Sequence, residues 1–171
     1  MSYIQQTTLD LPTIVNIAEA RQRCHEFNAV ITAGPRLREV SDFNHPNHKV
    51  VEFDDTTLRR FGGPQYSDVK TLITWGSGQE NVLVHCHAGI SRSTATAWGI
   101  AIANGRDPEE AFLDLQAKHP TKQHMTVNGA IEYNSRPFSP NELIVEHLEK
   151  LFKIDNLHKI NDKHSQWGRS W

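Results

Sequence analysis

The sequence predicts an α/β fold in which helices flank a central, mostly parallel sheet. Three observations support this prediction. Short apolar segments rich in β-branched residues, at 29–32 and 82–84, are typical of buried strands. Segments whose apolar residues recur at helical spacing lie between these strands. At 82–104 a strand leads through a short glycine-containing loop directly into a long helix. Such alternation of strands and helices favours parallel strand pairing.

The first half of the chain supplies two helices and two strands. A helix is expected over 12–27, because Ile14, Ile17, Cys24 and Phe27 recur at helical spacing. Strands are expected at 29–32 and 50–53, and a loop at 54–64. The apolar positions of 66–75 predict a second helix, which the glycines at 76 and 78 end.

The second half continues the same alternation. The strand at 82–84 is followed by a helix from about 92 to 104, which Gly105 ends, and by another that starts at Asp107. Residues 119–135 have no clear periodicity and resemble an inserted loop, in which His124 and Tyr133 are candidates for the mouth of a pocket. A last helix is expected from 141 to 152. The chain of 171 residues suits a single domain, 1–154, followed by a polar tail, 155–171, that frays.

Composition excludes several classes of function. The 18 Lys and Arg residues are balanced by 20 Asp and Glu residues, for a net charge of −2, so no nucleic-acid partner is expected. No apolar run is long enough to span a bilayer, and the N-terminus has no features of a signal peptide, so no membrane partner and a cytoplasmic location are expected. In a reducing compartment the two cysteines, Cys24 and Cys86, would remain thiols.

The segment at 82–104 combines three features that bind anions. The strand delivers Cys86 to the carboxyl edge of the sheet, where α/β proteins bind ligands. Backbone N–H groups of a short loop can converge on an anion, and the following helix adds the positive end of its dipole. The candidate phosphate-binding residues are therefore those of the loop and the first residue of the helix: His87, Ala88, Gly89, Ile90, Ser91 and Arg92.

The same features predict a reactive cysteine. A thiolate, not a thiol, is the nucleophile, and neighbouring positive charge favours its formation. Arg92 offers a planar fork that can hold two oxygens of one phosphate. The hydroxyl of Ser93 can hydrogen-bond the sulfur and ease its departure. Cys86, Arg92 and Ser93 are therefore candidate catalytic residues.

This segment resembles a known family. The string His85-Cys86, five residues, Arg92 and Ser93 is similar to the H-C-x5-R-[ST] motif of the cysteine-dependent protein tyrosine phosphatase superfamily. The full string HCHAGISRS resembles its dual-specificity branch. The resemblance implies a protein tyrosine phosphatase-like fold of the dual-specificity type. It also implies hydrolysis of phosphomonoesters on proteins, phosphotyrosine above all and phosphoserine or phosphothreonine as further substrates, through a cysteinyl-phosphate.

Such chemistry needs a general acid on a separate loop. Asp54 and Asp55 follow the strand at 50–53 and so lie at its carboxyl end. In the resembled phosphatases the acid is found at about this spacing before the cysteine, and Asp55-Thr56 fits their pattern better. Asp55 is the candidate acid and Asp54 the alternative; Arg59 and Arg60, which follow, are more simply explained as solvated.

Two residues are expected to support the site from behind. The segment 136–141 resembles the R-P-x-x-S-P-N segment that closes dual-specificity domains, and Asn141 in it is both a helix N-cap and a support of the loop. His85 is expected to hydrogen-bond the loop backbone. The pair His45 and His48 suits a solvated loop rather than a metal site, and no metal and no other cofactor is expected.

Three alternatives stay open at this point. A phosphoinositide or an RNA 5′-phosphate could be the substrate on the same fold, although inositol-lipid members usually have lysines in the loop and this loop has none. The domain could bind phosphoproteins without cleaving them. A rhodanese-like sulfur transferase is the third. A phosphorylated protein or peptide is the expected partner.

Overall fold

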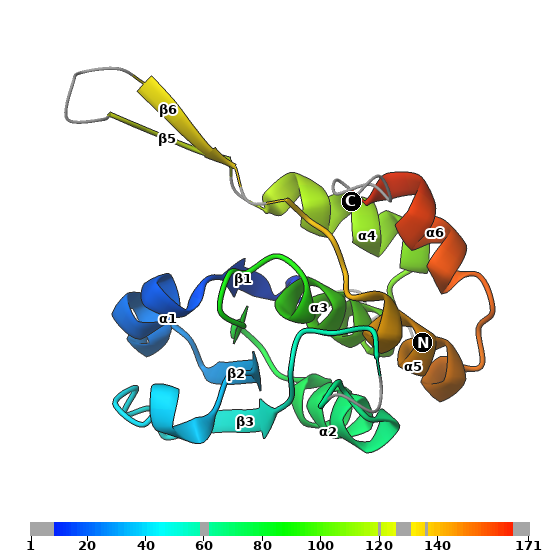
Figure 1. Ribbon diagram of the computed structural model, residues 1–171, viewed down its shortest axis with the longest axis horizontal. Helices are drawn as coiled ribbons and strands as arrows, with labels where there is room; N and C mark the ends of the chain where they lie inside the picture. The colour runs from blue at the N-terminus through cyan, green and yellow to red at the C-terminus, as the bar shows by residue number, and fades with distance from the viewer. Residues whose placement is uncertain (1–8, 59–61, 120, 126–130, 136, 166–171) are drawn as a thin grey trace.

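The computed structural model describes residues 9–58, 62–119, 121–125, 131–135 and 137–165. Its centre is a four-stranded sheet in the order β1-β4-β2-β3, in which every pair is parallel. The strands are β1 (Thr13–Val15), β2 (Ala29–Gly34), β3 (His48–Glu52) and β4 (Val82–His85). The predicted fold class, an α/β fold with a mostly parallel sheet between helices, is confirmed (Figure 1).

The larger layer covers one face of the sheet. It contains α2 (Tyr66–Gly76), α3 (Arg92–Ala103), α4 (Pro108–Lys118), α5 (Glu142–Phe152) and α6 (Leu157–His164). Strand residues that share this face, such as Ile31 and Val84, join its apolar core around Trp98 and Phe112. Because side chains alternate along a strand, Val30 and Leu83 face the other way.

The smaller layer covers that other face. It consists of α1 (Ile17–Arg23) and the short 3₁₀ helices η2 (Cys24–Glu26) and η3 (Leu37–Glu39). Its core includes Cys24 and Phe43. Thr32 follows Val30, and His85 follows Leu83, at the spacing of two residues that keeps side chains on one face. The polar side chains of Thr32 and His85 therefore lie on the face of the sheet that the smaller layer covers.

Three expectations differ from the structure. The segment 12–27 is not one helix, since β1 occupies its start and pairs with β4 before α1 begins. Residues 119–135 are not an irregular loop but contain β5 (Thr121–Met125) and β6 (Ile131–Ser135), an antiparallel pair that extends away from the body of the molecule (Figure 1). The side chains of His124 and Tyr133 lie outside the described residues, as do Arg59 and Arg60.

The third difference is at the C-terminus. Residues 157–164 of the expected polar tail form α6, because Leu157 and Ile160 are buried in the larger layer. The buried Asn161 donates to the carbonyl of Pro140 at 3.1 Å. This part of the expected tail therefore packs against the domain.

Candidate active site

Cys86 lies directly after β4, at the carboxyl edge of the sheet, and is 3% exposed. The loop that follows packs against the end of β1. Gly89 has a φ of +73°, and a Cβ on it would lie 2.9 Å from the backbone of Val15. A glycine is therefore required here both by the backbone conformation and by the neighbouring strand.

The sulfur of Cys86 is surrounded by hydrogen-bonding groups. The backbone N–H of Gly89 donates to Sγ at 3.3 Å, and the buried hydroxyl of Ser93 lies 3.2 Å from it. Helix α3 begins at Arg92, so the positive end of its dipole is in the same turn of chain. The N–H of Gly89 and the start of α3 both place partial positive charge near the sulfur.

Arg92 is almost completely buried, with 7% of its surface exposed. Its Nη1 donates to the carbonyl of Phe53 at 2.8 Å, and its Nη2 donates to Nδ1 of His87 at 3.1 Å. Its Nε is buried and has no hydrogen-bond partner among the described residues. The guanidinium is thus fixed from two sides while one buried donor remains unused, which suits a site for an anion.

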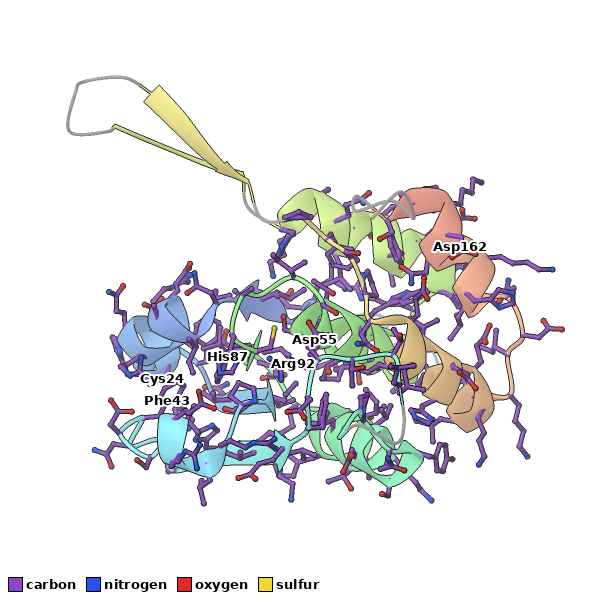
Figure 2. All side chains as sticks on the ribbon, viewed as in Figure 1. Cys24, Phe43, Asp55, His87, Arg92 and Asp162 are labelled. Atoms are coloured by element: carbon purple, nitrogen blue, oxygen red, sulfur yellow. The ribbon has the colours of Figure 1, made fainter. Side chains whose placement is uncertain are left out.

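The imidazole of His87 links Arg92 to Glu39 in η3. Since Nδ1 accepts from Arg92, a neutral His87 carries its proton on Nε2, which donates to Glu39 Oε1 at 2.8 Å. The pKa of Glu39 is lowered, chiefly by the backbone N–H of Arg36 and then by His87. Figure 2 shows His87 and Arg92 side by side. Glu39 belongs to no motif, so sequence analysis missed it.

Asp55 is held next to the Cys86 loop by two donors. The hydroxyl of Ser91 and Nδ2 of Asn141 each donate to its Oδ1 at 2.9 Å. No hydrogen bond among the described residues involves Oδ2. Asp54 has a different environment, because its Oδ1 accepts from Arg36 Nη2 at 2.8 Å at the exposed surface.

Asn141 also caps α5, where its Oδ1 accepts from the N–H of Ile144 at 3.0 Å. Its own N–H donates to the carbonyl of Ser91 at 3.1 Å, and the N–H of Ser139 donates to that of Ile90 at the same distance. The segment 139–141 is therefore attached to both the Cys86 loop and Asp55. The hydrogen bonds of Asn141 thus cap α5 and attach this segment to the Cys86 loop, the two contacts expected from the sequence.

Comparison with solved structures identifies this arrangement of elements. Three matches are the Cydia pomonella PTP-2 phosphatase (20% identity, TM-score 0.55), the human tyrosine phosphatase-like serine/threonine/tyrosine-interacting protein (17%, 0.51) and PTPMT1 in complex with PI(5)P (18%, 0.52). The matches cover 80%, 82% and 84% of this chain and 83%, 86% and 92% of the respective structures.

The chain has the protein tyrosine phosphatase fold. The dual-specificity-like resemblance is confirmed at the level of the fold. Neither a protein-family model nor a curated protein matches the sequence.

In this fold the two cysteines, Cys24 and Cys86, do not form a disulfide. Both are free thiols, and the sulfur of Cys24 lies 3.4 Å from the carbonyl oxygen of Phe43 in the smaller layer. Among the described residues, no three His, Cys, Asp or Glu side chains are placed to hold a metal ion. No helix in the described ranges is long and apolar enough to cross a membrane.

Two histidines, His85 and His48, make hydrogen bonds inside the molecule, and only those of His85 were predicted. Nδ1 of the buried His85 lies 2.9 Å from the carbonyl oxygen of Cys86, as expected for a residue that supports the loop. His48, expected in a solvated loop, is instead half-buried in β3, and its Nε2 lies 2.7 Å from the hydroxyl of Thr32. That expectation is wrong because the strand begins earlier than its apolar residues indicate.

Gly34, at the end of β2, is a position where one methyl group should disturb the candidate phosphate site. A Cβ there would lie 2.7 Å from Cζ and 2.8 Å from Cδ of Arg92. Gly34→Ala should therefore displace the guanidinium and lower kcat/KM for an aryl phosphate by about 100-fold, the effect of a misplacement near 1 Å.

Gly78→Ala is the matched control for Gly34→Ala. Both glycines have a positive φ, but a Cβ on Gly78 would meet nothing within 4 Å. This control should lose stability in thermal unfolding and retain its kinetics. Equal kinetic losses in both variants would exclude a specific role for the contact with Arg92.

Proposed function

We propose that the chain hydrolyses phosphomonoesters on proteins, phosphotyrosine in the first place and phosphoserine or phosphothreonine as further substrates. The observation that carries the proposal is the environment of the Cys86 sulfur. It accepts from the N–H of Gly89 at 3.3 Å and lies 3.2 Å from Ser93, within the turn that brings Arg92 to the same loop. A nucleophile and an anion site thus share one segment.

In the first step, the Cys86 thiolate would attack phosphorus. The S–P bond forms as the bond from phosphorus to the leaving oxygen breaks, and Asp55 gives that oxygen a proton. Arg92 and the N–H groups of the loop hold the charge on the transferring phosphoryl group. The products of this step are the dephosphorylated substrate and a cysteinyl-phosphate.

In the second step, a water molecule would attack phosphorus from the side that the substrate has left. Asp55, now a carboxylate, takes a proton from the water, and the S–P bond breaks to release inorganic phosphate. The hydroxyl 3.2 Å from the sulfur, that of Ser93, stabilises the departing thiolate. The cycle returns Cys86 to the thiolate and Asp55 to its protonated form. Together, Cys86, Asp55, Arg92 and Ser93 provide a group for each step.

An open depression beside the loop supports a peptide as the substrate. It is lined by polar residues of the acid loop and of the segment that closes the site, among them Thr56, Thr57, Ser139 and Glu142. Residues that flank a phosphorylated side chain could contact these hydroxyl and carboxylate groups.

A phosphoinositide is the second candidate substrate. The likeness to PTPMT1, whose solved structure contains PI(5)P, favours it. Two observations count against it. The loop contains no lysine, and the carboxylate of Glu39, 2.8 Å from His87, would repel a second phosphate group.

A substrate panel tests the proposal. The purified chain would be incubated with p-nitrophenyl phosphate, phosphotyrosyl and phosphoseryl peptides, PI(5)P, a 5′-phosphorylated RNA and thiosulfate. We expect release of phosphate from the aryl phosphate and the phosphotyrosyl peptide, inhibition by vanadate and none by EDTA. Hydrolysis of PI(5)P alone would favour the second candidate, and binding of phosphopeptides without phosphate release would favour a non-catalytic module.

A further inference from the structure

Three side chains from three adjacent strands meet on the face of the sheet that the smaller layer covers. The hydroxyl of Thr32 in β2 lies 2.7 Å from Nε2 of His85 in β4 and 2.7 Å from Nε2 of His48 in β3. Thr32 and His85 have no exposed surface. Since Nδ1 of His85 is 2.9 Å from the carbonyl oxygen of Cys86, the contacts form a chain from His48 to the backbone of the candidate nucleophile.

The carbonyl at one end determines the direction of every bond in this chain. A carbonyl oxygen only accepts, so His85 must carry a proton on Nδ1. Burial lowers the pKa of His85 to about 4, so the ring is neutral at pH 7 and its Nε2 is an acceptor. The hydroxyl of Thr32 must then donate to His85, and its oxygen accepts from Nε2–H of His48.

The surroundings of the chain keep its members in place. The ring of Phe43 is stacked on that of His48, with centroids 5.4 Å apart and planes 10° apart. It also contacts the ring of His85 at 5.2 Å. Because this layer excludes water around His85, a solvent molecule could not easily replace a lost donor, and an unpaired ring nitrogen there would be costly.

We propose that Thr32 and His48 are positioning residues for the Cys86 loop. The hydroxyl of Thr32, which His48 orients, satisfies the buried Nε2 of the Nδ1–H tautomer of His85, and His85 holds the carbonyl of Cys86. A trans peptide is planar and its C=O and N–H point in opposite directions, so a fixed carbonyl also fixes the N–H of His87, one of the candidate phosphate-binding groups. The kinetic part of this proposal depends on the proposed phosphatase function, whereas the tautomer and phosphate binding do not.

The test compares Thr32→Val with Thr32→Ser. Valine keeps the volume and the β-branch but removes the hydroxyl, while serine keeps the hydroxyl. In ¹H–¹⁵N spectra of the imidazole rings, wild type and Thr32→Ser should contain His85 in the Nδ1–H form. In Thr32→Val the buried Nε2 loses its donor, so the population of the Nδ1–H form should fall. The kcat of this variant on p-nitrophenyl phosphate should fall roughly 10- to 100-fold, as expected for a misplaced loop, and its affinity for inorganic phosphate should fall as well.

His48→Phe provides a second variant in case Thr32→Val does not fold. Phenylalanine retains the stacking on Phe43 and removes only the donor to Thr32, so a smaller loss of the same kind is expected. An unchanged His85 tautomer in Thr32→Val would overturn the hydrogen-bond chain. In His48→Phe the hydroxyl of Thr32 can still donate to His85, so unchanged kcat and phosphate affinity in that variant would overturn the role of His48. A changed tautomer with unaltered kcat and phosphate affinity would overturn the positioning role. If the wild type hydrolyses no phosphate ester, the proposed phosphatase function is wrong. The tautomer of His85 and the affinity for inorganic phosphate would still test the positioning role of Thr32 and His48.

Discussion

Replacement of Cys86 by serine should abolish turnover, with a loss of roughly 10⁴-fold or more in kcat on p-nitrophenyl phosphate, as when other covalent catalysts lose their nucleophile. In the proposed mechanism Cys86 reacts as a thiolate, whereas a serine hydroxyl retains its proton at neutral pH. The smaller oxygen fits the same space between Gly89 and Ser93. The variant should therefore fold normally and still bind a phosphotyrosyl peptide.

The control is Cys24→Ser, in the smaller layer, where the thiol lies 3.4 Å from a backbone oxygen and outside the candidate site. Its activity should stay within a few-fold of wild type. Steady-state kinetics, thermal unfolding and peptide binding would be measured on both variants. Residual activity of more than a few per cent in Cys86→Ser would mean that another group attacks phosphorus.

Asp55→Asn should lower kcat by about 10²–10⁴-fold on a substrate with a poor leaving group, such as a phosphotyrosyl peptide or an alkyl phosphate. Asparagine can still accept from Ser91 or Asn141 but has no proton to give to the leaving oxygen. The loss should be much smaller on p-nitrophenyl phosphate, whose leaving group departs without protonation. The slope of log kcat against the pKa of the leaving group is the decisive measurement.

Asp54→Asn is the matched control for the acid. It weakens an exposed ion pair with Arg36, an interaction that contributes little free energy in water. It should show almost no dependence on the leaving group. If the dependence appeared in Asp54→Asn instead, the acid would be the neighbouring residue. If it appeared in neither variant, Glu52 and Asp68 would be tested next.

The parts of the fold that could be predicted are those with a local cause. Val82 to Val84 form an uninterrupted apolar strand, and the glycine and serines after it mark a turn into a helix, so Cys86, Arg92 and Ser93 could be assigned from one segment. β1 was missed because Ile14 fits the helical spacing of Ile17 equally well. Three residues form too short a strand to override that pattern.

α6 and the support of Arg92 could not be predicted, for a different reason. Only Leu157 and Ile160 of α6 are apolar core residues, too few to distinguish it from a polar tail. Glu39 contacts His87 from 48 positions away in the sequence, and the carbonyl of Phe53 contacts Arg92 from 39 positions away. No motif marks either of them. Their roles follow from the order of strands in the sheet, which a single sequence does not reveal.

The hydrogen bonds of Asn141 also bear on how the site would move. This one side chain caps α5 and holds Asp55, and its backbone N–H binds the Cys86 loop. An outward swing of the acid loop would take away one of these partners, so opening the site has an energetic cost from the start. In many enzymes the closing of a lid limits turnover. Here Asp55, the proposed acid, is already anchored to Ser91 of the Cys86 loop, so we expect a chemical step rather than the closing of a loop to limit turnover.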